Sequence, residues 1–217
     1  MSSPAHALGY PIRRGAGRAW LTGVPLLLLF PLSFVLVFGY ALRATRAAYS
    51  DPNAPPPGFA FEAQLVRDGV LSAALVLALT LPFAVLAWWA AGAVSNVLHI
   101  THDAFLDRAY SLLAAGFLLA IPWGLLLLLL VPANIAAYCV TGQARDLFDP
   151  VQAMSRVRDR FLDWNLASAA IVTGWALGFA ATGLLCVGFL PGAFYAILVS
   201  AYATASLAPR APTAPAG

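Results

Sequence analysis

The sequence predicts an all-α integral membrane protein, a bundle of about five transmembrane helices with a cytoplasmic interfacial amphipathic helix. Hydrophobic residues make up 61% of the 217 residues and charged residues 10%, which lies outside the usage of a soluble domain. Residues 112–139 contain six consecutive leucines and no charged side chain, and similar stretches flank them. An uncharged apolar run of this length matches the roughly 30 Å hydrocarbon core of a bilayer as a helix.

Five apolar segments divide the chain, and we expect residues 19–207 to form a single transmembrane helical domain. The fifth segment is short, and Pro191 and Gly192 before it predict a tight turn between antiparallel helices. Residues 1–18 and 208–217 are rich in Pro, Ala and Gly, show no apolar face to bury, and are expected to be flexible tails. The segments cover residues 19–42, 69–94, 112–139, 166–190 and 193–207.

The first segment has two possible courses. A spanning helix leaves eight Arg on one side of the membrane and four on the other. Pro25 and Pro31 each remove an amide donor, so the helix can instead break between them and return to the side it entered, which changes the count to eleven against one. We take the spanning helix as the expectation, and the re-entrant course stays open.

Arginine distribution predicts the orientation and the compartment. All 12 basic residues are Arg, a bias typical of a GC-rich prokaryotic genome. Because the side richer in Arg faces the cytoplasm, residues 43–68 and 143–165 are predicted to be cytoplasmic loops of a multi-pass protein of the prokaryotic inner membrane. We interpret the net charge of +3 as a signal that orients the protein in the membrane and as a contact with anionic headgroups of the lipid bilayer. No nucleic-acid partner is expected.

Residues 149–152 predict the start of the interfacial helix. Asp149 suits the N-cap, Pro150 the first helical position and Gln152 the third. Behind this start, apolar side chains recur at helical spacing and polar side chains occupy the other face. We interpret the helix as a topology anchor in the interface; the alternative is a face that docks lipid or a partner. Its residues are Val151, Met154, Arg156, Val157, Arg158, Arg160, Phe161 and Trp164.

Two stripes of small residues at i, i+4 spacing predict where membrane helices approach each other closely. We expect them to pack segments 112–139 and 166–190 together within the chain, and a homo-oligomer face is the alternative. One stripe consists of Gly116, Ala120 and Gly124, and the other of Ala170, Gly174, Gly178 and Thr182.

Residues 99–107 are the one cluster with metal-ligand chemistry. On a helix, His99, Asp103 and Asp107 share a face that offers three ligands to zinc, with His102 nearby. The spacing matches no strong zinc motif, so we expect no metal here. We expect instead a polar loop in which Thr101 caps the next helix and Asp103 favours its positive end, and the zinc site is the alternative.

Catalytic residues are not expected in this chain. No ionisable side chain lies in the interior of a predicted span, and Asn134 is the strongest polar group there. The chain also lacks a Gly-rich phosphate loop and the nucleophile elbow of hydrolases. We therefore expect neither a cofactor nor an enzymatic activity.

Four motifs in order along the chain resemble an uncharacterised prokaryotic membrane family, domain of unknown function 4013. They are residues 39–46 (GYALRATR), 65–69 (LVRDG), 148–151 (FDPV), and 186–188 (CVG) with Phe194 and Tyr195. Residues 54–59 (APPPGF) replace the acidic, Trp-rich loop of the family. The resemblance implies a multi-pass inner-membrane protein and supplies no activity or site residues.

The sequence favours a membrane-embedded scaffold or accessory subunit, working as a homo-oligomer or in a larger membrane complex. The first alternative is a small permease or channel for a neutral or lipidic substrate. A water-filled cavity lined by Asn134 and Thr80 would support this alternative. The second is a metal-dependent membrane enzyme that uses His99 and His102.

Overall fold

The computed structural model describes residues 4–29, 33–98, 103–184 and 188–208, and within these ranges it contains helices and no strand. Apolar and small residues without an alternating pattern favour helix throughout. The elements are α1 (Pro4–Gly9), η1 (Tyr10–Ile12), α2 (Gly17–Leu28), α3 (Phe34–Ser50), α4 (Ala63–Leu98), α5 (Ala104–Thr141), η2 (Ala144–Leu147), α6 (Pro150–Asp159), α7 (Phe161–Leu184) and α8 (Phe189–Ala205).

Three helices of the described chain are long and apolar enough to cross a membrane. They cover Ala63–Asn96 in α4, Ala104–Thr141 in α5 and Phe161–Ala181 in α7. The fifth predicted segment corresponds to α8, a shorter apolar helix of 17 residues. These helices are compatible with a membrane protein by their length and composition.

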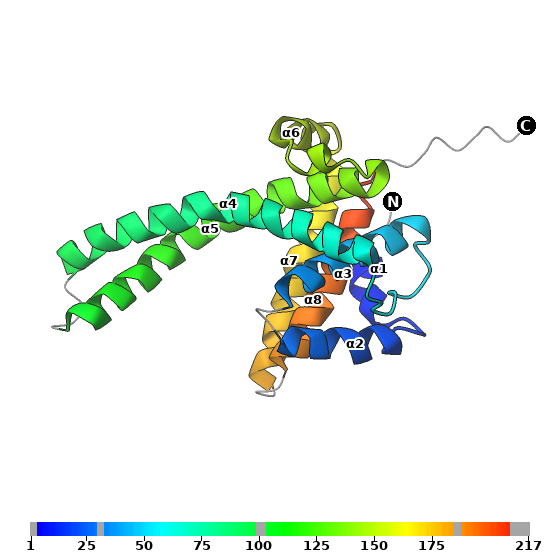
Figure 1. Cartoon of the computed structure of the whole chain (residues 1–217), viewed down its shortest axis with the longest axis horizontal. Helices are drawn as coiled ribbons and strands as arrows, with labels where there is room; N and C mark the ends of the chain where they lie inside the picture. Colours follow the sequence, from blue (N-terminus) through cyan, green and yellow to red (C-terminus); the bar gives the residue numbers. More distant parts are fainter. Residues whose placement is uncertain (1–3, 30–32, 99–102, 185–187, 209–217) are drawn as a thin grey trace, which may run out of the picture.

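The α4–α5 hairpin projects away from the other helices (Figure 1). The two helices run side by side, and their ends near residues 98 and 104 lie farthest from the remaining elements. Near the body, Leu75 of α4 and Tyr138 of α5 are buried with Leu42 of α3 and Leu147 of η2. Towards the tip, large apolar side chains such as Leu81, Trp89, Phe117 and Ile121 are exposed to the surroundings.

The first apolar segment forms two helices rather than one. α2 ends at Leu28 and α3 begins at Phe34. At this break, the Ser33 hydroxyl donates to the carbonyl of Leu26 at 2.5 Å, and the Ser33 amide donates to the carbonyl of Leu29 at 3.2 Å. Pro25 lies inside α2, so the interruption follows it by several residues.

α2 packs on α8 through Gly23. A Cβ added at Gly23 would lie 2.0 Å from the ring of Phe194, so only glycine allows this approach. The Phe194 ring also meets Trp20 edge to face, with centroids 5.2 Å apart, and stacks on Tyr40 at 5.7 Å. These aromatic contacts hold α2, α3 and α8 together as the main core of the body.

The amino-terminal residues 4–12 pack on the body, although the sequence analysis found no apolar face in this region. Ala7, Tyr10 and Pro11 are buried, and the rings of Tyr10 and Tyr202 lie 5.0 Å apart. The Tyr195 hydroxyl donates to the carbonyl of Leu8 at 2.9 Å. Burial raises the pKa of the Tyr10 hydroxyl, which therefore stays neutral. Helical spacing over so short a stretch gives no readable pattern, which is why sequence alone missed this contact.

The turn expected at Pro191 and Gly192 lies earlier in the chain. Gly188 is the N-cap of α8, and both residues belong to the first turn of that helix. Proline is tolerated there because first-turn amides have no partner within the helix.

Candidate functional site

The first two family-like motifs form the crossing of α3 and α4. A Cβ added at Gly39 would lie 2.1 Å from the carbonyl oxygen of Leu65, and one added at Gly69 would lie 2.0 Å from that of Val35. The two backbones therefore touch at two places, and each needs a residue without a side chain. This contact places the first turns of α3 beside the first turns of α4.

The crossing brings Arg46 of α3 to Asp68 of α4, where they form an ion pair. Asp68 is 2% exposed, and its Oδ1 accepts a hydrogen bond of 2.7 Å from the hydroxyl of Tyr138 in α5. The Arg46 guanidinium lies over the Tyr138 ring, 5.2 Å from its centroid. A charged carboxylate so deeply buried requires such partners, and here they join three helices.

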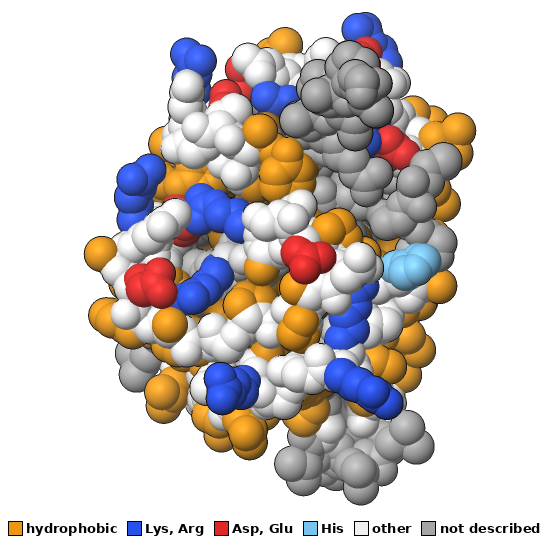
Figure 2. Space-filling model, turned by 90° about the vertical axis from the view of Figure 1, so that its right-hand side faces the viewer, with side chains coloured by type: hydrophobic (Ala, Val, Ile, Leu, Met, Phe, Trp, Pro, Cys, Tyr) orange, Lys and Arg blue, Asp and Glu red, His pale blue; other side chains and the backbone are white. Residues whose placement is uncertain are grey.

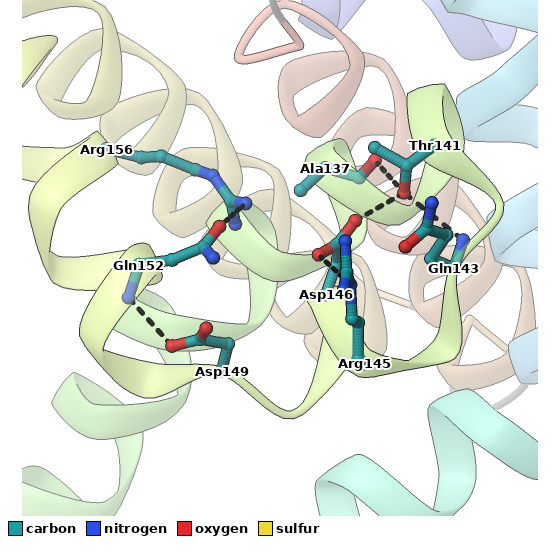
Figure 3. Close-up of polar contacts among 8 residues, drawn as sticks. All are labelled: Ala137, Thr141, Gln143, Arg145, Asp146, Asp149, Gln152 and Arg156. Atoms are coloured by element: carbon teal, nitrogen blue, oxygen red, sulfur yellow. Dashed lines mark hydrogen bonds and ion pairs between the residues drawn. The ribbon is translucent and has the colours of Figure 1, made fainter.

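Beyond this junction, α5 ends in a short polar turn (Figure 3). Gly142 adopts a left-handed conformation with φ +67°, and its amide donates to the carbonyl of Tyr138 at 2.9 Å. The Thr141 hydroxyl donates to Oδ2 of Asp146 at 2.5 Å, which fixes η2 against the end of α5. The chain is thereby directed into α6.

α6 begins at Pro150 with Asp149 as its N-cap, as the sequence predicted. Oδ1 of Asp149 accepts from the Gln152 amide at 2.9 Å, but the Gln152 side chain accepts instead from Nη2 of Arg156 at 2.6 Å (Figure 3). Half of the predicted capping box is therefore present. Ala153 and Val157 form the face of α6 that is buried against Leu130 and Ala133 of α5.

The helix predicted to continue through Trp164 breaks at Arg160, which has φ −127° and ψ 42°. Phe161 and Trp164 consequently belong to α7. The Arg160 side chain holds this corner, because it donates to Oδ2 of Asp163 at 2.7 Å and to the carbonyl of Leu207 at 2.8 Å. Helical spacing did not reveal the break, and one of the contacts that hold this corner comes from the distant end of α8.

A cavity of about 240 Å³ lies where α5 ends, beneath α6 and beside the start of α7. Most of its wall is apolar, and its polar side chains come from the α6–α7 corner and the end of α5. The lining residues are Ala133, Ala136, Ala137, Val140, Thr141, Arg156, Val157, Asp159, Arg160, Trp164 and Leu207. Asn134 and Thr80, named for a permease, do not line it: Asn134 is buried, and the Thr80 hydroxyl accepts from Nε1 of Trp123 at 3.1 Å.

Of the metal-ligand candidates, the structure describes Asp103 and Asp107. Asp103 is the N-cap of α5, where Thr101 was expected, and its Oδ1 accepts from the amides of Phe105 and Leu106 at 2.9 and 3.0 Å. Asp107 accepts from the Ser95 hydroxyl. His99 and His102 lie outside the described residues, and no three potential metal ligands come together within the described ones.

The two small-residue stripes have different surroundings. A Cβ at Gly174 would lie 2.8 Å from Val199, and one at Gly178 would lie 2.4 Å from the carbonyl oxygen of Gly192, so this stripe packs on α8 and not on α5 as expected. Ala170 of the same stripe is buried, and the side chain of Thr182 lies outside the described part. By contrast, Gly116 and Gly124 have no atom within 4 Å of an added Cβ, and Ala120 is exposed.

A family profile matches most of the chain. Residues 24–187 fit the profile described as "Protein of unknown function (DUF4013)". The chain belongs to this family. No curated protein and no solved structure matches the chain. Gly39, Arg46, Asp68 and Gly69 all lie within the part that matches the DUF4013 profile, and together with Tyr138 they build the junction of α3, α4 and α5.

Sequence analysis missed the junction as a site. Arg46 and Asp68 were placed in the predicted cytoplasmic loop 43–68, and neither was linked to Tyr138. The one available indication was that Arg46 and Asp68 occur in the two family-like motifs, about two turns after Gly39 and directly before Gly69, the glycines that the helix crossing requires.

Proposed function

We propose that this DUF4013 protein is a non-enzymatic scaffold or accessory subunit of a membrane complex, and that the α4–α5 hairpin is the element through which it assembles. The observation that carries the proposal is how little the chain covers this hairpin. Of the most apolar 18-residue windows, 17% of the residues in α4 and 11% in α5 are buried within the protein. Lipid and other subunits are left to cover the remainder.

Helix length supports an assembly element that reaches beyond its own fold. α4 has 36 residues and α5 has 38, which at 1.5 Å per residue gives about 54 and 57 Å. A bilayer core needs about 20 residues, so the part packed on the body and the projecting part can serve different purposes. Bonds such as that between Trp123 and Thr80 keep the two helices together as one surface.

The open stripe on α5 supports close packing with another helix. Gly116 and Gly124 leave space on the α5 surface that no residue of the described chain fills. Membrane helices associate through such small residues because close backbone approach increases van der Waals contact. A helix from a second copy of the chain or from a different subunit would fill the space at Gly116 and Gly124.

The contacts around the first segment support a re-entrant hairpin followed by four spans, with the protein in a prokaryotic inner membrane. Arg13, before α2, donates to the carbonyl of Ala54, after α3, at 3.0 Å. The Thr22 hydroxyl accepts from the amide of Phe59 at 3.3 Å. A segment that spanned the membrane would hold these partners on opposite sides. The re-entrant course also gives eleven cytoplasmic Arg against one.

Surface charge agrees with this orientation. Figure 2 shows the face on the right of Figure 1, away from the hairpin, with Arg and acidic side chains spread over it. Arg14, Arg18 and Glu62, which the re-entrant course places in the cytoplasm, are exposed. We infer that this face and residues 143–165 are cytoplasmic, and that the interfacial helix lies among anionic headgroups.

The test replaces Gly116 and Gly124 together by Leu. Both positions are open within the chain, so the variant should fold with unchanged thermal stability. Leu118→Phe serves as the control, because Leu118 is 72% exposed on the opposite side of α5 and the change also enlarges an outward-facing side chain. Each protein is extracted with its native lipid in polymer nanodiscs, and components present in stoichiometric amount are quantified by mass spectrometry.

We expect a stoichiometric component, either a second copy or another subunit, with the wild type and with Leu118→Phe, and its loss from the Gly116/Gly124 variant. If the wild type is monomeric and carries no stoichiometric protein, the scaffold proposal is wrong. If the variant and the control lose the stoichiometric component equally, the Gly116/Gly124 stripe is not the contact through which the protein assembles.

A further inference from the structure

The cavity beneath α6 contains two buried donors that lack acceptors. Nη1 of Arg156 and Nε1 of Trp164 are both inaccessible to solvent and have no hydrogen-bond partner among the residues that the structure describes. Buried polar groups in proteins are almost always paired. Both donors belong to side chains that line one cavity, so a small rotation of these side chains would bring the donors to an acceptor held there.

The charge in the cavity favours an anion. Arg156 bonds the neutral amide of Gln152 and forms no ion pair with any described residue. Arg160 is already occupied by Asp163 and the end of α8. Asp159 also lines the cavity, but its side chain is 60% exposed. Its Oδ1 lies 3.6 Å from Nε of Arg158, with which it forms an ion pair. Arg156 thus remains as an uncompensated guanidinium, a group that binds phosphate oxygens well.

The walls favour a lipid over a free ion. Apart from the two donors, the cavity is formed mainly by Ala, Val and Leu side chains from the ends of α5 and α8. Next to it, Val151, Met154 and Phe161 expose large apolar surfaces at the α6–α7 corner. A volume of 240 Å³ is below the roughly 300–1,000 Å³ of pockets for drug-sized ligands, but it suits a headgroup.

We propose that this cavity binds the phosphate of an anionic phospholipid, with Arg156 and Trp164 as donors and the acyl chains lying along the exposed apolar side chains of α6 and α7. Helix ends, an indole and arginines occur together at the depth of phospholipid headgroups. The site uses the end of α5 that packs on the body and not the projecting part with Gly116 and Gly124, so it does not rest on the proposed assembly role.

The test measures lipid binding by native mass spectrometry of the full chain, with phosphatidylglycerol and phosphatidylcholine of the same acyl chains. Arg156→Gln removes the charge, and Trp164→Phe removes the indole N–H while it keeps an aromatic ring. Arg158→Gln is the matched control, because it has the same charge change on a neighbouring side chain that is 83% exposed. Inorganic phosphate is tested separately by its effect on thermal stability.

We expect the wild type and Arg158→Gln to prefer phosphatidylglycerol, and Arg156→Gln to bind it about tenfold more weakly, as for one lost charge-assisted hydrogen bond. Trp164→Phe should weaken binding in the same direction, and it keeps the test valid if Arg156→Gln does not fold. Equal losses for Arg156→Gln and Arg158→Gln, no preference between the two lipids, or stabilisation by inorganic phosphate equal to that by phosphatidylglycerol would each overturn the proposal.

Discussion

The carboxylate of Asp68 joins three helices because each of its oxygens has a different partner. Oδ2 pairs with Arg46 of α3, and Oδ1 accepts from Tyr138 of α5. Arg46 also covers the Tyr138 ring, so removal of the carboxylate would leave a partly buried guanidinium without its counter-ion. Loss of one member of such a group costs more than the group contributes as a whole.

We predict that Asp68→Asn lowers the free energy of unfolding by roughly 3 kcal/mol. Tyr138→Phe keeps the ring under Arg46 and should cost about 1 kcal/mol, the value of one hydrogen bond. Asp159→Asn is the control, because its exposed pair with Arg158 should contribute less than about 1 kcal/mol. Unfolding of the purified variants in one detergent, followed by circular dichroism, measures the differences. Equal effects of Asp68→Asn and Asp159→Asn would contradict the assigned role of the junction.

A second prediction at this scale concerns metal. Asp103 caps α5 and Asp107 accepts from Ser95, so both acids have structural roles that need no ion. The double variant His99→Ala/His102→Ala should therefore contain the same amount of bound zinc as the wild type, measured by elemental analysis of purified protein. Stoichiometric zinc that disappears from the variant would establish a metal site and reopen the enzyme hypothesis.

At the scale of elements, glycines determine which helices meet. α7 approaches α8 where Gly178 faces Gly192, and α3 approaches α4 at Gly39 and Gly69. Gly116 on α5 has no such neighbour. The same residue type thus marks a filled contact on α7 and an open surface on α5.

This difference predicts opposite responses to the same substitution. Gly178→Ile should destabilise the folded monomer by about 1–3 kcal/mol, because it forces α7 away from the backbone of α8. Gly116→Ile should leave the thermal stability of the monomer unchanged. Thermal unfolding and detergent size exclusion of both variants provide the comparison. If Gly178→Ile keeps its stability and only an oligomer disappears, the α7 stripe is intermolecular.

The sequence predicted the features that depend on local pattern. Apolar runs gave the long helices, Asp149 and Pro150 gave the start of α6, and Gly174 and Gly178 gave a close helix contact. Features that depend on distant partners were missed. Arg46 and Asp68 are 22 residues apart, and Tyr138 is 70 residues from Asp68. No periodicity links such positions, so the junction, the break at Arg160 and the partner of the α7 stripe emerged only from the fold.

At the scale of the whole molecule, the course of the first segment decides which loops face the cytoplasm. Residues before α2 contact residues after α3 at Arg13 and Ala54, and Arg160 ties the start of α7 to the end of α8. The Arg-rich connections therefore lie at the body, while the adjoining ends of α4 and α5, at Leu98 and Ala104, lie farthest from it (Figure 1). The re-entrant course predicts that this far end is the extracytoplasmic one.

The last prediction tests this topology with single cysteines in intact cells. With Cys139 and Cys186 changed to Ala, cysteines replace Ser3, Ser50 or Thr101, and each is probed with a membrane-impermeant thiol reagent. The re-entrant course predicts protection of Ser3→Cys and Ser50→Cys and labelling of Thr101→Cys, because eleven of twelve Arg then lie in the cytoplasm. Permeabilised cells, in which all three should react, control for buried thiols. Labelling of Ser3→Cys with protection of Ser50→Cys would mean that the first segment spans the membrane, and the contact between Arg13 and Ala54 could not then exist in the cell.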